Sequence, residues 1–118
     1  MPQLERGRIV WFFASDPQGH NPKKRAFVIV TSTEEIRPDQ PFKGVAVTGT
    51  FRKPLDPNCV ALPWAPTKHP RTGFRKECVA VCDWICEIHP GTELQIGGTV
   101  PGKQLLEILK KVDALAEG

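Results

Sequence analysis

The sequence predicts a mainly β fold, a small and strongly bent barrel closed by one C-terminal helix. Three observations support this prediction. The apolar runs are short and rich in β-branched and aromatic residues. The 12 prolines and 10 glycines among the 118 residues divide the chain often. Only the last stretch shows long helical spacing of apolar residues. A chain of this length forms one domain, which we assign to residues 1–118.

The first half is expected to contain three strands. Residues 7–13 (GRIVWFF) form the first, and the loop SDPQGHNPKK follows, marked by Pro, Gly and Asn. Residues 25–32 (RAFVIVTS) form the second strand, which is apolar nearly throughout and therefore buried on both faces. In TSTEEIRPD, Pro38 limits any helix to about one or two turns. Residues 44–51 (GVAVTGTF) form the third strand.

The second half begins with an irregular, Pro-rich and basic stretch over residues 52–74, with a short strand at CVALPW. A long strand is expected at residues 77–88 and a short one within 92–100. One amphipathic helix is expected over about 100–117, with Pro101 in its first turn and Gly118 at its end. Its apolar stripe consists of Leu105, Leu106, Ile108, Leu109, Val112 and Leu115. These elements together predict an SH3-like barrel.

Composition points to a soluble globular protein, with 40% hydrophobic and 25% charged residues. No segment approaches the ~18 consecutive apolar residues of a membrane span. The run IVWFFA is too short for a signal peptide and lacks a basic flank. We therefore expect a cytoplasmic protein without a membrane partner. A barrel of this size has little core, so a homodimer is expected to add buried surface.

Four cysteines lie at positions 59, 78, 82 and 86, a spacing that matches no CxxC zinc motif. If residues 78–86 form a strand, the last three point to one face. The favoured interpretation is small buried hydrophobic side chains in a reducing compartment, and a metal or disulfide role is the alternative. We predict neither a metal site nor a cofactor.

The net charge of +3 is unevenly distributed along the chain. Residues 52–76 carry six Lys or Arg and one acid, Asp56, and residues 23–25 add three more cations. Residues 77–100 carry four acids and no Lys or Arg. Two loop segments therefore concentrate positive charge, which favours either a polyanionic ligand or an ordinary solvated face.

Two residues at strand ends are candidates for holding a phosphate. Arg25 starts the second strand, and its planar guanidinium matches two phosphate oxygens and stays charged. Thr48 lies at the end of the run VAV, beside Gly49, where its hydroxyl can donate to a phosphate oxygen. The alternatives are a solvated arginine and a β-favouring threonine at a sheet edge.

Further candidates lie in the loops and in the long strand. His20 can shuttle a proton or contact RNA, and Asp83 interrupts an apolar strand, where a carboxylate needs a cleft or a basic partner. Aromatic rings beside cations suit the stacking of single-stranded bases, although such rings also anchor loops. The predicted RNA-binding residues are Lys23, Lys24, Arg52, Trp64, Lys68, His69, Arg71, Phe74 and Arg75.

These motifs together resemble the MazF/PemK/Kid toxins of bacterial toxin–antitoxin systems. RGRIVWFFASDPQGHNPKKRAFVIVTS resembles the family's opening strand, its D-P…G-H/S loop and its Arg-started strand. VAVTGTF resembles the third strand with its threonine, and GFRKECVAVCDWICEI resembles the strand that carries an aspartate. IGGTVPGKQLLEILKKVDAL resembles the closing strand and the C-terminal helix. The resemblance runs from about Glu5 to Ala116.

The resemblance implies an SH3-like barrel of the MazF/PemK/CcdB type, a homodimer, and metal-independent, sequence-specific cleavage of single-stranded RNA through a 2′,3′-cyclic phosphate. By position, Arg25 and Thr48 match the catalytic arginine and threonine of the family. His20 and Asp83 match the histidine and aspartate of the Kid-like branch. The resemblance also implies inhibition by an antitoxin, an acidic and partly disordered partner.

The chain departs from the family pattern at three positions. Val81 stands where the Kid-like branch has an arginine, Asn21 replaces an acid, and Ala26 replaces a proline. The alternative function is therefore a catalytically degenerate SH3-like barrel that binds RNA or DNA without cleaving it. A third possibility is a poison of a protein target, because the gyrase poison CcdB shares this barrel, but the basic loops argue against it.

Overall fold

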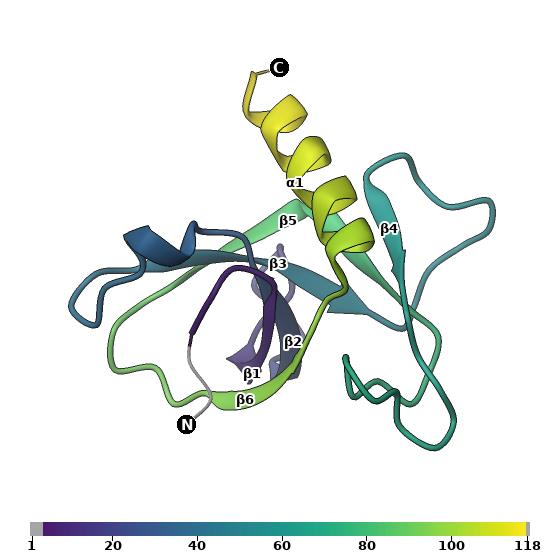
Figure 1. Cartoon of the computed structure of the whole chain (residues 1–118), viewed down its shortest axis with the longest axis horizontal. Helices are drawn as coiled ribbons and strands as arrows, with labels where there is room; N and C mark the ends of the chain where they lie inside the picture. The colour runs from purple at the N-terminus through teal and green to yellow at the C-terminus, as the bar shows by residue number, and fades with distance from the viewer. Residues whose placement is uncertain (1–3, 118) are drawn as a thin grey trace.

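A computed structural model describes residues 4–117 and contains six strands, one short 3-10 turn and one helix (Figure 1). The strands are β1 (Arg8–Ala14), β2 (Lys23–Ile29), β3 (Phe42–Thr48), β4 (Cys59–Leu62), β5 (Cys78–Ile88) and β6 (Gln95–Thr99). The helix α1 spans Gly102–Glu117, and the 3-10 turn spans Thr33–Glu35. All six expected strands and the helix are present, which confirms the mainly β prediction. The expected helix end at Gly118 lies outside the described residues.

The six strands form one antiparallel sheet in the order β4-β5-β3-β2-β1-β6. The sheet curls strongly, but its two edge strands β4 and β6 do not pair with each other, so the barrel is open on one side (Figure 1). The loop between β4 and β5 reaches β6, where the amide of Thr99 donates to the carbonyl of Arg71 at 2.9 Å. This loop therefore bridges the two edges of the sheet.

Apolar side chains cover both faces of the sheet. The helix-side face carries Ile9, Val28 and Val45, which form one core cluster with Ile108 of α1. On the opposite face, a second cluster includes Phe12, Phe27, Ile29, Phe42 and Ile88. Because successive side chains of β2 alternate between these clusters, residues 26–30 are all buried, as the apolar run predicts.

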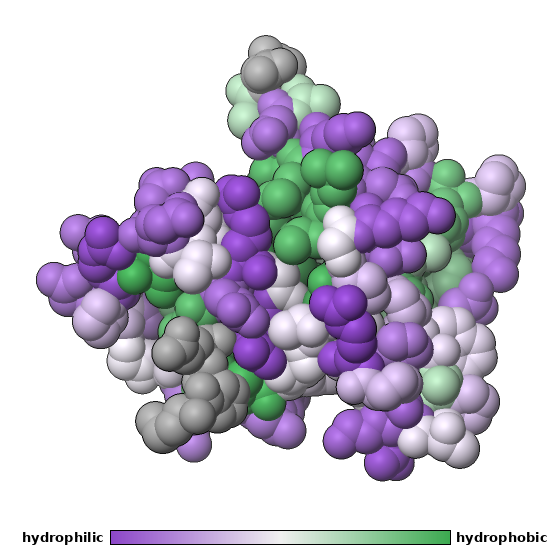
Figure 2. Space-filling model, viewed as in Figure 1, coloured by the Kyte–Doolittle hydropathy of each residue, from purple (hydrophilic) through white to green (hydrophobic). Residues whose placement is uncertain are grey.

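Helix α1 packs against β4 and β5 and leaves part of its own surface apolar. Leu105, Leu109 and Val112 face the helix-side cluster, and the ammonium of Lys111 donates to the carbonyl of Pro57 at 2.5 Å. Figure 2 shows apolar surface around the helix, on which Leu106 is 55% exposed. Within residues 4–117, no helix is long and apolar enough to cross a membrane.

Strand β5 changes faces in its middle, so the prediction that three cysteines share one face is wrong. Val45 pairs with Ile85 and Ala46 pairs with Val81, so residues 82–84 have no counterpart on β3. An odd number of extra residues reverses the alternation of side chains. Cys78 and Cys82 accordingly lie in the helix-side cluster, whereas Cys86 packs against the opposite cluster.

All four cysteines are free thiols. Burial raises the pKa of Cys78 to about 11, with a further contribution from the nearby Glu77 carboxylate. Burial also raises the pKa of Cys82 to about 11. Two of the thiols are therefore core side chains that stay protonated at neutral pH, in agreement with the favoured sequence interpretation.

Candidate active site

The strand register places Arg25 and Thr48 side by side on adjacent strands. Ala26 of β2 pairs with Val47 of β3, and both belong to the helix-side face. Arg25 precedes Ala26 and Thr48 follows Val47, so Arg25 and Thr48 lie opposite each other on the two antiparallel strands. Because side chains alternate along a strand, both point to the sheet face away from the helix. Two residues 23 positions apart in the sequence thus meet at the open end of the sheet.

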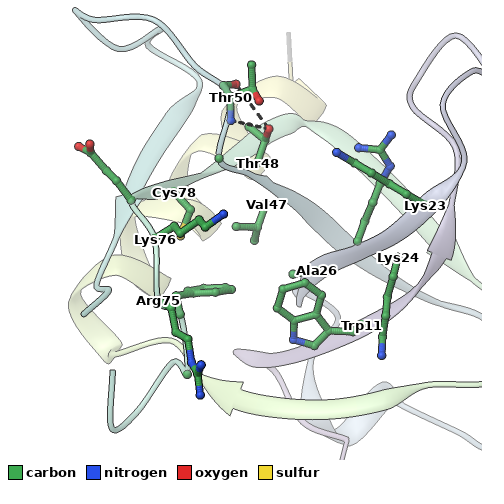
Figure 3. Close-up of a pocket in the computed structure, with 15 residues that line it drawn as sticks. Trp11, Lys23, Lys24, Ala26, Val47, Thr48, Thr50, Arg75, Lys76 and Cys78 are labelled. Atoms are coloured by element: carbon green, nitrogen blue, oxygen red, sulfur yellow. Dashed lines mark hydrogen bonds between the residues drawn. The ribbon is translucent and has the colours of Figure 1, made fainter. Parts of the chain in front are cut away.

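A first cavity of about 610 Å³ opens at this end of β2 and β3 (Figure 3). In Figure 3, Trp11 and Lys76 point into the cavity from opposite walls, and Lys24 points away toward β6, where its ammonium bonds to the side chain of Gln95. Cations outnumber acids along its rim, so the cavity attracts anions. Its lining consists of Trp11, Lys23, Lys24, Arg25, Ala26, Val47, Thr48, Gly49, Thr50, Gly73, Phe74, Arg75, Lys76, Glu77 and Cys78.

A second cavity of about 500 Å³ adjoins the first and shares Thr48 and Thr50 with it. Asp83 lines this cavity together with Asp56, Arg52, Cys59 and the apolar side chains of Phe51, Pro54, Leu55 and Val81. Val81 pairs with Ala46, so this cavity opens on the same sheet face as Arg25 and Thr48. Within residues 4–117, the carboxylate of Asp83 has neither a hydrogen bond nor an ion pair.

The guanidinium of Arg25 is held by neutral groups. Its Nε donates to the carbonyl of Ala14 at 3.0 Å, and its Nη2 donates to the carbonyl of Asn21 at 2.6 Å. Its central carbon lies 5.2 Å from the centroid of the Trp84 ring. No carboxylate of the described residues pairs with Arg25. The positive charge of Arg25 is therefore oriented but not neutralised.

The loop between β1 and β2 is organised around Asp16. Its Oδ1 accepts the amides of His20 at 2.8 Å and Gln18 at 3.1 Å, and its Oδ2 accepts the side-chain amide of Asn21 at 3.1 Å. These bonds, the His20 amide foremost, lower the pKa of Asp16 below its usual value of 3.8. Asn21, which has a positive φ of 52°, is thereby held where its carbonyl binds Arg25.

Protonation of Asp16 is expected to loosen this loop. Because folding lowers the pKa of Asp16, its contribution to stability is fully present above 3.8 and is lost as the pH falls through the lower, folded value. The variant Asp16→Asn should therefore melt below the wild type at pH 6 to 7, with a difference that shrinks below about pH 4. Thermal unfolding followed by circular dichroism between pH 2 and 7 measures this difference.

Asp39→Asn serves as the matched control, because the exposed Asp39 carboxylate makes no hydrogen bond or ion pair within the described residues. Its melting curve should follow the wild type across the same pH range. A difference between Asp16→Asn and the wild type that is independent of pH contradicts the assigned role of the carboxylate.

The other predicted site residues fall into three groups. Lys23, Lys24, Phe74 and Arg75 line the first cavity, although Phe74 is only 6% exposed and packs edge-on against Trp11. Arg52 lines the second cavity. The remaining residues line neither cavity, and they are His20, Trp64, Lys68, His69 and Arg71.

His69 has a structural task in the loop between β4 and β5. Its Nδ1 accepts the amides of Arg71 at 3.1 Å and Thr72 at 3.3 Å, which shapes the turn that leads to Phe74. An aromatic ring beside cations in the sequence is thus used here to order the loop. The RNA-contact prediction for His69 remains a prediction.

Sequence reasoning gave no site role to Trp11 and Lys76, which line the first cavity, or to Trp84, which lines neither cavity but contacts the Arg25 guanidinium. The sequence did contain a signal for Trp11. It is an aromatic residue in the expected strand 7–13, which leads directly into the basic loop. Lys76 was part of the recognised charge cluster. Trp84 could not be assigned, because its position depends on the irregularity of β5.

Within residues 4–117, no three His, Cys, Asp or Glu side chains are grouped so that they could hold a metal ion. The charged and polar side chains of the two cavities are the guanidinium groups of Arg25, Arg52 and Arg75, lysine ammonium groups, threonine hydroxyls, and the carboxylates of Asp56, Glu77 and Asp83. These groups can bind a phosphodiester and accept a proton.

No family model matches the chain, and no curated protein is similar to it in sequence. Solved structures do match over the whole chain. MazF from Deinococcus radiodurans (Form-I) matches with a TM-score of 0.73 and 17% identity, covering 100% of both chains. A MazE–MazF complex from the same organism (Form-II) matches with a TM-score of 0.72 and 16% identity, over 99% of this chain and 98% of that one.

An endoribonuclease from a mycobacterial species also matches, with a TM-score of 0.66 and 20% identity over 99% of this chain and 94% of the other. Identities of 16 to 20% relate these proteins through their architecture. The curled antiparallel sheet and the C-terminal helix of this chain therefore form the fold of the MazF proteins.

Proposed function

We propose that this protein is an endoribonuclease toxin that cleaves single-stranded RNA, in a sequence-specific and metal-independent manner. The observation that supports this most strongly is the pair of Arg25 and Thr48 on adjacent strands of a MazF fold, at the rim of a cation-rich cavity. A guanidinium and a hydroxyl beside each other are suited to bind the two non-bridging oxygens of a phosphodiester.

The proposed reaction uses the RNA itself as the nucleophile. The ribose 2′-OH attacks the adjacent phosphorus, the bond from phosphorus to the 5′ oxygen breaks, and the departing oxygen takes a proton from water, so that the products are a 2′,3′-cyclic phosphate and a 5′-OH end. Asp83, which is unpaired in the adjoining cavity, accepts the 2′ proton. Arg25 stabilises the additional negative charge of the phosphorane electrostatically, because its high pKa makes it a poor proton donor.

Thr48 is ready to donate to the phosphate. Its Oγ1 accepts the amide of Thr50 at 3.1 Å, which fixes the side chain. Its hydroxyl reaches the carbonyl of Thr50 only at 3.4 Å, longer than a normal O–H···O hydrogen bond. A phosphate oxygen can therefore replace this carbonyl as the acceptor at little cost.

The RNA strand is proposed to pass over the ends of β2 and β3 from one cavity to the other. Lys23, Arg75 and Lys76 bind backbone phosphates at the first cavity, where Trp11 offers a stacking surface, and Arg52 does so at the second. Lys24, Trp64, Lys68, His69, Arg71 and Phe74 are proposed to extend or support this path. His20, on the loop, contacts RNA that lies across it.

We further propose that an acidic, partly disordered antitoxin covers the same basic surface, and that the toxin works as a homodimer in the cytoplasm. A MazE–MazF complex is among the similar structures, which supports a protein inhibitor. Exposed Phe13 (72%) and Ile85 (41%) provide apolar surface that a second copy would bury.

The test is incubation of the purified protein with long single-stranded RNA in the presence of EDTA. The expected products carry 5′-OH and 2′,3′-cyclic phosphate ends at a short recurring sequence, as read by end-specific ligation and sequencing. Intact RNA over many sequence contexts, together with salt-sensitive binding of RNA or DNA, would instead assign the alternative function of a binding barrel without cleavage.

A further inference from the structure

We infer that Trp84 is a positioning residue for Arg25, and that its ring reports directly on an anion that reaches the guanidinium. The inference deepens the proposed function, since it takes the ligand of Arg25 to be a phosphate of single-stranded nucleic acid. It depends on three observations, which concern the free edge of the guanidinium, the contact with the ring, and the irregularity of β5.

Among the residues that the structure describes, nothing bonds to one of the three nitrogens of the Arg25 guanidinium. A guanidinium carries five N–H donors in one plane. Nε and Nη2 are engaged by the carbonyls of Ala14 and Asn21. Within residues 4–117, no protein oxygen accepts a hydrogen bond from Nη1. The two carbonyls therefore fix the plane of the guanidinium and leave Nη1 available for a ligand.

The Trp84 ring adds a contact that uses none of these in-plane donors. A cation 5.2 Å from a ring centroid is attracted by the π face, which leaves the N–H groups at the edge free. The ring is itself fixed, because it packs edge-on against Phe27 with centroids 6.5 Å apart. Phe27 in turn stacks on Phe12 at 4.5 Å. A stack of aromatic side chains thus supports the guanidinium.

The irregularity of β5 puts Trp84 in this place. In a regular strand, residue 84 would follow Cys82 onto the helix-side face. The three residues of β5 without counterparts on β3 reverse the alternation, and Trp84 joins the opposite cluster, on the face that carries Arg25. The same break leaves Asp83 exposed at the second cavity. The irregularity of β5 therefore places Trp84 beside Arg25 and Asp83 at the second cavity.

The first test compares two substitutions that both keep apolar bulk. Trp84→Phe retains an aromatic face for Arg25, whereas Trp84→Leu does not. We expect turnover (kcat) of RNA to fall about 10-fold in Trp84→Leu and less than 3-fold in Trp84→Phe, with KM changed less than 3-fold in both. Thermal melts of both variants report any loss of packing. Equal kcat values in the two variants overturn the inference.

The second test does not require cleavage. In a Trp11→Phe/Trp64→Phe background, Trp84 is the only fluorophore of its kind. A saturating single-stranded 2′-deoxyoligonucleotide, which lacks the nucleophilic 2′-OH, is expected to shift the Trp84 emission, because a phosphate bound at Nη1 changes the electric field of the guanidinium that lies against the ring. Adding Arg25→Ala should abolish this shift while the oligonucleotide still binds through the lysines.

These tests separate the two proposals. A protein that leaves RNA intact but shows the Arg25-dependent emission shift retains the positioning role and loses the nuclease function. A protein that cleaves RNA equally well with Phe or Leu at position 84 retains the nuclease function and loses the positioning role. An emission shift that is absent, or that persists in Arg25→Ala, overturns the inference with or without cleavage.

Discussion

Replacing Arg25 by alanine is expected to lower kcat for RNA cleavage by about 10³-fold, the upper range for removal of one stabilising donor from an active site. The guanidinium is the one cation that the described structure orients beside Thr48 without a counter-charge. Its loss removes the group proposed to balance the additional negative charge of the phosphorane, a charge that the ground-state phosphodiester does not carry. The effect should therefore appear in kcat more than in KM, measured with an end-labelled oligonucleotide.

The control for this variant is Arg37→Ala. The guanidinium of Arg37 likewise bonds to backbone carbonyls, those of Glu34 and Ile36, but Arg37 lines neither cavity. Its removal should leave cleavage within 2-fold of the wild type. Arg25→Ala with a normal rate and an unchanged melting temperature would exclude Arg25 as a catalytic residue.

Arg25→Lys separates charge from geometry at the same position. Lysine keeps the positive charge but cannot donate to the Ala14 and Asn21 carbonyls while it presents a flat edge to a phosphate. An intermediate rate is expected, about 10-fold to 100-fold below the wild type. A rate equal to that of Arg25→Ala would mean that orientation of the fork, and not the charge alone, carries the effect.

The sequence was sufficient to predict the strands, the helix and two residues of the candidate site, Arg25 and Thr48. Local patterns such as the apolar run 26–30 and the helical spacing of Leu105, Leu109 and Val112 depend only on which face is buried. Arg25 and Thr48 could be singled out because the sequence places each at the end of an apolar run next to a turn, although β2 begins two residues before Arg25, at Lys23. Their adjacency follows from antiparallel pairing of consecutive strands, which is the commonest connection in β proteins.

The features that the sequence did not predict depend on departures from regular strand geometry. The face switch of β5 arises from three residues without counterparts on β3, and nothing in CVAVCDWICEI shows where the alternation breaks. The sequence therefore placed Cys86 on the wrong face and gave no role to Trp84. Similarly, Phe74 appeared to be a loop aromatic, but the loop folds back into the helix-side cluster and buries it. Such long-range packing is set by the whole fold.

The second large effect is expected at the open side of the barrel, where the loop between β4 and β5 contacts β6. We predict that Gly98→Ala destabilises the protein. A Cβ on Gly98 would lie 1.8 Å from the carbonyl oxygen of Arg71, a backbone atom that cannot rotate away. The loop would have to retreat from β6 and lose the hydrogen bond from the amide of Thr99 to that carbonyl. We expect a loss of about 3 kcal/mol in the free energy of unfolding, or roughly 12 °C in Tm.

Gly102→Ala is the matched control for this prediction, because a Cβ on Gly102 has no heavy atom within 4 Å. It lies at the start of α1, where alanine favours the helix, so stability should be unchanged or slightly higher. Urea denaturation of the wild type, Gly98→Ala and Gly102→Ala measures the difference.

Because the loop between β4 and β5 carries Arg75 and Lys76 into the first cavity, Gly98→Ala should also weaken RNA binding at temperatures below its melting temperature. Equal stability of the two variants would show that the loop does not depend on its close contact with β6, and the first cavity would then lack the rigid wall that the proposed RNA path requires.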